Sequence, residues 1–137
     1  GYGRIAHFVS PERVQQNNVS LYSVPEKLAL NTFGYGGQWM VAQEYAQPQK
    51  NAVLQLQFSA KEVFLVIRSK DGKEGNVKVL LDGKVVAGVA GSDVVQGTVT
   101  VRDNKLYKLI KLPKSGEHEL KLEFLDGNLE LYAFTFG

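Results

Sequence analysis

Few side chains in this chain have the types and spacing that acid–base or metal chemistry needs. His7 and His118 are the only histidines. His118 lies between Glu117 and Glu119, but neighbouring side chains in a strand point to opposite faces, so these three do not form a compact cluster. His7 has no obvious partner in its apolar segment. Because zinc needs three or four protein ligands, the two separated histidines predict no metal site.

Nucleophilic chemistry has no recognisable motif either. The chain contains no cysteine, which excludes disulfides, thiolate metal sites and thiol catalysis by this segment. None of the serines lies in the Gly-x-Ser-x-Gly pattern of a nucleophile elbow. We therefore predict that the chain is not an enzyme, with no catalytic residues and no cofactor.

The glycine-rich stretch FGYGGQW, at residues 33–39, raises the question of a phosphate-binding loop. It lacks the Gly-Lys-Ser/Thr ending of a P-loop and the dinucleotide fingerprint. A phosphate cradle also uses the N-terminus of a helix, whereas strand-like residues follow here. These glycines therefore predict tight turns.

Calcium is a separate question, because several aspartates lie in predicted turns. Three of the five precede glycine or lie at a hairpin tip, where aspartate is favoured by turn geometry alone. None shows the dense spacing of oxygen ligands found in a calcium loop. A structural calcium ion stays an open alternative. The aspartates are Asp71, Asp82, Asp93, Asp103 and Asp126.

Aromatic side chains are the feature that could carry binding, since their flat rings can stack on a sugar or a peptide. Trp39 and Tyr132 each share a predicted strand face with apolar residues, which places both in the core. Tyr35, in the glycine-rich stretch, is the candidate for an exposed ring. With Tyr35 we predict Gln38, Gln55 and Gln57 as ligand contacts, because the last two lie on the non-core face of a strand.

The elements that must position these residues are almost all strands. Alternating apolar residues indicate strands, Asp82-Gly83 marks a hairpin tip, and SPERV at 10–14 could begin a short helix. Short strands at this spacing predict an all-β fold, an antiparallel β-sandwich or jelly roll. The predicted strands are 38–46, 53–58, 62–68, the two arms of hairpin 76–89, 98–102, 105–112, 118–125 and 129–136.

The final stretch, LELYAFTFG at 129–137, is unusually aromatic for a chain end. Tyr132, Phe134 and Phe136 fall on one face of the predicted strand. We expect this strand to close the sandwich, with Leu131 and Ala133 covered from its other side.

Length and charge narrow the class of protein further. The 137 residues suit one domain over 1–137. A net charge of +2 is too small to predict a nucleic-acid partner, and no apolar run is long enough to span a bilayer. No signal peptide is visible, which by itself says little; because the chain starts on Gly1 rather than Met, we expect it to be excised from a larger protein.

Four stretches resemble the C-terminal module of DipZ-type thiol:disulfide interchange proteins, which is also called the thioredoxin-like C-terminal domain. The last of the four is the most specific, because it ends in YAFTFG. The stretches are GYGR at 1–4, LALNTFGYGGQWMVAQEYA at 28–46, LLDGKVV with GSDVVQGTVTV within 80–101, and LYKLIKLPKSGEHELKLEFLDGNLELYAFTFG at 106–137.

This resemblance implies a jelly-roll fold like that of carbohydrate-binding modules. It implies an upstream thioredoxin-fold domain that carries a Cys-x-x-Cys pair and faces the extracytoplasmic side. In many members a membrane domain of the cytochrome c biogenesis type tethers the protein. The family pattern names no catalytic residue in this module. Two alternatives follow: the module binds a glycan or similar ligand, or it docks on the thioredoxin domain and orients it toward protein partners.

Overall fold

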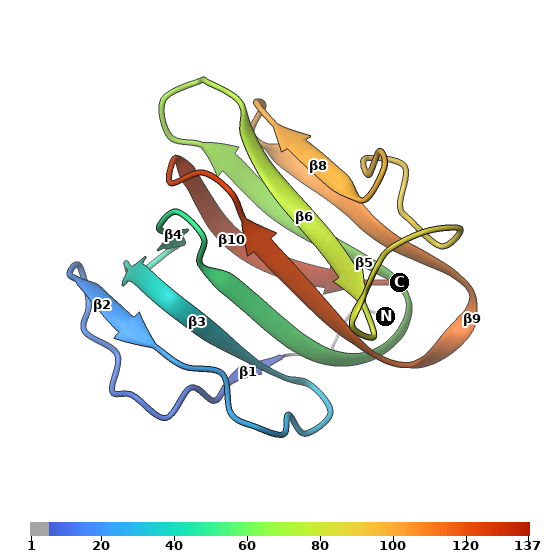
Figure 1. Cartoon of the computed structure of the whole chain (residues 1–137), viewed down its shortest axis with the longest axis horizontal. Helices are drawn as coiled ribbons and strands as arrows, with labels where there is room; N and C mark the ends of the chain where they lie inside the picture. Colours follow the sequence, from blue (N-terminus) through green and yellow to red (C-terminus); the bar gives the residue numbers. More distant parts are fainter. Residues whose placement is uncertain (1–5) are drawn as a thin grey trace.

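Ten β-strands make up the secondary structure of residues 6–137, the part of the chain that the computed structural model describes (Figure 1). No helix able to cross a membrane is found in that part. The strands are β1 (His7–Phe8), β2 (Val19–Tyr22), β3 (Thr32–Val41), β4 (Ala46–Pro48), β5 (Val53–Ser69), β6 (Gly75–Leu81), β7 (Lys84–Val85), β8 (Thr98–Val101), β9 (Lys105–Phe124) and β10 (Leu129–Phe136).

The two longest strands, β5 and β9, form the spine of the fold. They pair antiparallel from Val53↔Glu123 to Ile67↔Lys105, with shifts in register near Ala60–Glu62 and Val63–Phe64. Such bulges bend and twist a strand pair. The sequence predicted two strands in each of these segments, but the hydrogen-bonded ladder continues through the expected turns, so each segment is one strand.

Because β5 is bent, its two halves serve different parts of the sheet. The first half pairs with β3, and the second half pairs with β10. The short β4 pairs with both β3 and β10, through Ala46 opposite Val41 and Leu131. The sheet thus folds over on itself as an antiparallel β-sandwich of the jelly-roll type, and the only parallel strand pair in the described part is β1–β3.

The core lies between the facing inner surfaces of this folded sheet. Every second residue is buried over 54–60 of β5 and over 120–124 of β9, as the alternation of side chains along a strand requires. The buried residues include Leu54, Leu56 and Phe58 on β5, and Leu120, Leu122 and Phe124 on β9. Gln55 and Gln57 alternate with these residues and are half-buried on the outer surface.

The glycine-rich stretch is part of β3 rather than a loop. Gly34 and Gly36 face away from the core, where Val24 and Pro25 cross the strand. A Cβ at Gly34 would lie 3.1 Å from Pro25 Cδ, and one at Gly36 would lie 2.6 Å from a Val53 methyl group. These two glycines therefore allow close packing; they do not make the tight turns that the sequence predicted.

The N-terminal third differs from expectation in two further ways. Residues 10–14 form no helix, because the Ser10 hydroxyl instead accepts a hydrogen bond from the Tyr35 amide at 2.9 Å and holds this segment against β3. The strand predicted over 38–46 ends at Val41. Residues 42–45 turn the chain, and β4 then runs antiparallel to β3.

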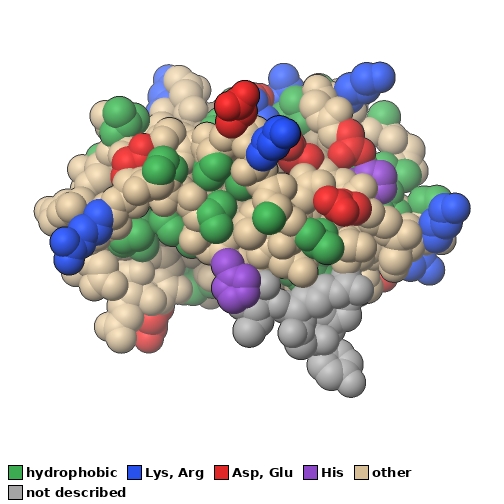
Figure 2. All heavy atoms as spheres, turned by 90° about the horizontal axis from the view of Figure 1, so that it is seen from below, with side chains coloured by type: hydrophobic (Ala, Val, Ile, Leu, Met, Phe, Trp, Pro, Cys, Tyr) green, Lys and Arg blue, Asp and Glu red, His purple; other side chains and the backbone are tan. Residues whose placement is uncertain are grey.

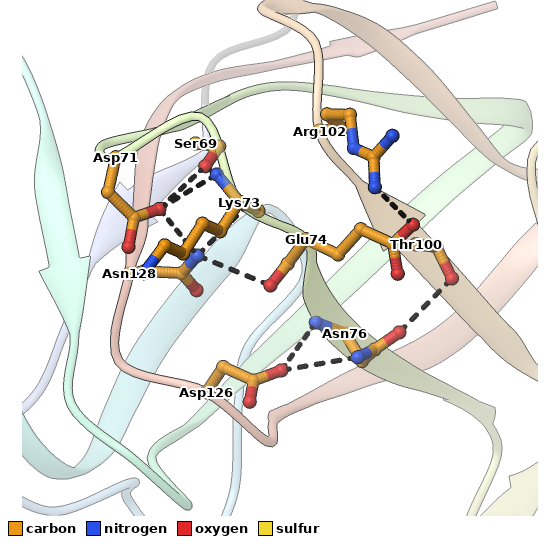
Figure 3. A network of polar contacts seen from close by, with 9 residues as sticks. All are labelled: Ser69, Asp71, Lys73, Glu74, Asn76, Thr100, Arg102, Asp126 and Asn128. Atoms are coloured by element: carbon orange, nitrogen blue, oxygen red, sulfur yellow. Dashed lines mark hydrogen bonds and ion pairs between the residues drawn. The ribbon is translucent and has the colours of Figure 1, made fainter.

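A polar network joins the turn after β5 to the turn before β10 (Figure 3). Asn128 Nδ2 donates to Asp71 Oδ1 at 3.0 Å and to the Lys73 carbonyl at 3.1 Å. Nearby, the Asn76 amide donates to Asp126 Oδ2 at 2.8 Å. The hydrogen bond from Asn128 is the main reason that the pKa of Asp71 lies below its ordinary value.

Replacing Asn128 with alanine is expected to lower the free energy of unfolding by about 1–2 kcal/mol, because two turns lose their shared donor. The measurement is urea unfolding followed by circular dichroism. Asn104→Ala is the matched control, since Asn104 is exposed and makes no side-chain hydrogen bond with any residue in 6–137. Equal midpoints for the two variants would show that the network contributes nothing measurable.

Hydrophobic side chains cross the middle of one outer face (Figure 2), while most lysines and arginines lie along its top and its two ends. Several large apolar side chains are exposed, including Val19, Leu21 and Val95. Scattered apolar exposure is normal for a folded domain. A binding site therefore has to be argued from a shaped hollow and its lining.

Candidate ligand-binding site

A hollow of about 390 Å³ opens between β3, the turn at 42–45 and β10. Its floor consists of inward-facing core residues, among them Leu54, Leu65 and Leu131. The turn brings Gln43 and Glu44 to the lining. An apolar floor with a few polar groups nearby is the usual make-up of a small-molecule site.

Two tyrosines stand at this hollow, one from the turn and one from β10. The ring centroids of Tyr45 and Tyr132 are 5.9 Å apart, and the ring planes are tilted by 47°. Tyr132 is 37% exposed. Aromatic faces that are open to solvent beside a hollow can stack on a flat apolar ligand surface.

The position of Tyr132 corrects the sequence analysis, which placed this ring in the core. The pairing of β10 with β5 is irregular between Leu131 and Phe134, so Tyr132 and Ala133 fall outside the regular ladder. Both are exposed, and the expected cover over Ala133 is absent. A bulge changes which face a side chain occupies, and alternation along the sequence does not reveal it.

Tyr35 also lines the hollow, but its ring is only 8% exposed, so the prediction of an exposed ring is wrong. It stacks on Trp39 with centroids 3.9 Å apart and planes 11° apart. Trp39 is fully buried, as predicted. Burial, followed by the nearby Tyr22, raises the pKa of the Tyr35 phenol far above its ordinary value, so the hydroxyl stays protonated.

The three predicted glutamines lie elsewhere. Gln55 and Gln57 share the outer face of β5, on the opposite side of the strand from the core. Gln57 Nε2 donates to Glu117 Oε2 at 2.8 Å. Gln38 is exposed on β3, opposite Leu21 of β2. The structure thus brings Gln55 and Gln57 together and separates them from the hollow that Tyr35 lines; their role as ligand contacts stays a prediction.

Sequence reasoning missed Tyr45, Gln43 and Glu44 as a group. It treated residues 38–46 as one strand, so the turn that carries these side chains to the hollow was not expected. Residues 42–45 contain none of the glycine, proline, asparagine or aspartate residues that mark turns, so no local signal indicated this turn. The charge of Glu44 is the only formal charge among the described residues that line the hollow.

His118 has a partner that the sequence did not indicate. Its Nδ1 lies 2.6 Å from Asp82 Oδ2, and the Glu119 amide donates to Asp82 Oδ1 at 2.9 Å. Burial works in the opposite direction, but these contacts hold the pKa of Asp82 below its ordinary value. The pair fastens the predicted Asp82-Gly83 hairpin tip to β9. Within residues 6–137, no three His, Cys, Asp or Glu side chains form a group suited to a metal ion.

Comparison with known proteins gives one family match. The family described as "Thioredoxin like C-terminal domain" matches residues 1–137. Among curated proteins, no sequence matches significantly.

Two solved structures of similar fold are carbohydrate esterases. A family two carbohydrate esterase from Clostridium thermocellum, in complex with cellohexaose, is 21% identical over 69% of this chain and 27% of its own, with a TM-score of 0.53. The corresponding esterase from Cellvibrio japonicus is 13% identical over 76% of this chain and 30% of its own, with a TM-score of 0.60. The chain therefore spans less than a third of either esterase, and likeness at this identity shows the fold alone.

A module from Clostridium stercorarium in complex with cellobiose overlaps 96% of both chains, with 11% identity and a TM-score of 0.41.

Proposed function

Since the chain belongs to the thioredoxin-like C-terminal domain family, we propose that it is a non-catalytic accessory module that binds a glycan in the hollow between β3 and β10. The observation that carries this proposal is the pair of tyrosines at the hollow, with one ring 37% exposed above an apolar floor. The similar fold of an esterase solved with cellohexaose supports this choice of ligand class.

The setting of the module is part of the same proposal. It follows a thioredoxin-fold domain in a protein of the DipZ type, on the extracytoplasmic side of a membrane to which the parent protein is tethered. Binding a cell-envelope glycan would keep the redox domain near its substrates. In this proposal the module itself contributes attachment rather than catalysis.

Replacing Tyr132 with alanine is expected to weaken glycan binding about tenfold, because a ring that stacks on a sugar face is lost while the fold is kept. The measurement is calorimetric titration of the intact chain with cellohexaose and with the β-1,4-linked hexamer of N-acetylglucosamine. Gln57→Ala is the control, since it removes a polar side chain from the outer face of β5 and leaves the hollow intact.

The two variants also separate two possible sites. If Gln57→Ala weakens binding and Tyr132→Ala does not, the glycan lies on the outer face of the sheet, as the sequence first predicted. If neither hexamer nor a wider panel of cell-wall polysaccharides binds the folded protein, glycan binding is wrong.

A docking module is the second candidate, and the apolar floor of the hollow favours it. Exposed apolar hollows also accept side chains of protein partners, and the partner here would be the thioredoxin-fold domain. This function predicts a higher melting temperature for the thioredoxin domain when it is joined to the module than when it is alone. Identical melting temperatures would exclude docking.

A further inference from the structure

Three properties of the hollow restrict the sugar that it can hold, namely its floor, one hydroxyl group and its charge. We infer that the hollow takes a neutral sugar bearing an acetyl group, with the acetyl methyl on the leucine floor and the acetyl carbonyl oxygen accepting a hydrogen bond from the Tyr35 hydroxyl. This inference rests on the glycan binding proposed above and names the class of ligand.

The floor selects for an apolar substituent. Leu54, Leu65 and Leu131 carry no polar side-chain atom, and each is at most 5% exposed. A sugar hydroxyl placed against them would lose its water without gaining a partner, which costs free energy. A methyl group in the same place loses nothing and gains from leaving water. An acetylated sugar presents that methyl group, whereas a plain glucan presents hydroxyls.

The Tyr35 hydroxyl provides the polar contact that an acetyl group needs. Buried tyrosine hydroxyls usually have a hydrogen-bond partner, and the other two buried tyrosines follow this rule. Tyr22 accepts from the Gln15 amide at 3.2 Å, and Tyr107 donates to the Asp103 carbonyl at 2.7 Å. Within residues 6–137 the Tyr35 hydroxyl makes no hydrogen bond, and it is not one of the fully buried polar atoms that lack a partner, so it is open to a ligand in the hollow that this residue lines.

The surroundings of Tyr35 hold its ring in place and keep its hydroxyl protonated. Stacking on Trp39 at 3.9 Å and contact with Phe8 at 4.7 Å hold the ring in place. Burial raises the pKa of the phenol, so the hydroxyl stays protonated and able to donate. An acetyl carbonyl oxygen is the matching acceptor.

The charge of the hollow disfavours acidic sugars. Glu44 is negatively charged, and the described lining contains no lysine or arginine. A uronic acid would bring a second negative charge to the hollow with no cation to balance it. The acetamido group of an N-acetylhexosamine is uncharged and avoids this repulsion.

The test compares two hexamers that differ only at the second carbon of each unit. By calorimetric titration, the N-acetylglucosamine hexamer is expected to bind about tenfold more tightly than cellohexaose, because the acetyl group in the hollow buries a methyl and accepts a hydrogen bond from the Tyr35 hydroxyl. A hexamer of galacturonic acid is expected to bind more weakly than either. Tyr35→Phe should reduce affinity for the acetylated hexamer about threefold to tenfold and reduce affinity for cellohexaose by a smaller factor.

Tyr107→Phe is the matched control, because it removes another buried hydroxyl away from the hollow and should not change either affinity. If cellohexaose binds as tightly as the acetylated hexamer, or Tyr35→Phe weakens both sugars equally, the acetyl inference is overturned and glycan binding stands. If no sugar binds the folded protein, both proposals are overturned.

Discussion

Removal of residues 132–137 is expected to unfold the domain at room temperature. Residues 134–136 pair with Val63, Phe64 and Leu65 of β5, so their loss bares the edge of a central strand. Phe136 is 8% exposed, and its ring lies 6.4 Å from that of Phe58. Deleting one buried phenylalanine side chain typically costs about 3–5 kcal/mol, against a total stability of about 5–15 kcal/mol for a domain.

The backbone at the end of β10 adds to this loss. The Gly137 carbonyl accepts hydrogen bonds from the Lys61 and Glu62 amides at 3.0 and 3.2 Å, where β5 departs from its regular register. Without the segment, the two amides can hydrogen-bond only to water, and the bend in β5 loses the contacts that stabilise it. The last strand therefore closes the fold, as predicted, although Tyr132 lies outside the core.

Circular dichroism during heating measures this effect, and Thr135→Ala is the control. Thr135 is exposed on the same strand, so its replacement should shift the melting temperature by no more than a few degrees. A truncated protein that melts cooperatively near the intact one would contradict the prediction.

Replacing Trp39 with alanine is expected to lower the free energy of unfolding by about 3–5 kcal/mol. Trp39 is fully buried, stacked on Tyr35, with its ring centroid 5.5 Å from that of Phe124. Its Nε1 donates to the Gly36 carbonyl at 3.1 Å, which is left without this donor in the variant. The loss of the Trp39 ring also removes the support that holds Tyr35 beneath the hollow.

Urea unfolding of the intact chain and the variant measures the difference. Tyr132→Ala is the control for removing a large ring, because Tyr132 is 37% exposed and should cost less than about 1 kcal/mol. If Trp39→Ala and Tyr132→Ala have the same midpoint, the aromatic stack is not an important part of the core. Retained stability in Trp39→Ala with weaker glycan binding would instead separate the stack from the fold and assign it to the site.

The candidate site shows where sequence reasoning stopped. It selected Tyr35 and placed the ring at the surface, because a tyrosine among glycines resembles a loop residue. In the structure Gly34 and Gly36 let Val24 and Pro25 lie against the outer face of β3, and Tyr35 points inward on the same strand. The inward orientation of Tyr35 therefore depends on the packing of a segment ten residues earlier in the chain, which no local sequence pattern indicates.

The sequence by itself determined the all-β class, the hairpin at Asp82-Gly83 and the buried faces at 54–58 of β5 and 120–124 of β9. These follow from period-two alternation and turn chemistry, which are local properties of a strand. Tertiary structure alone decided that β5 and β9 are single bent strands, and that an irregularity in β10 exposes Tyr132 beside Tyr45. Bulges depend on which strands pair and how far each ladder continues, so the hollow exists only once the whole sheet has folded over.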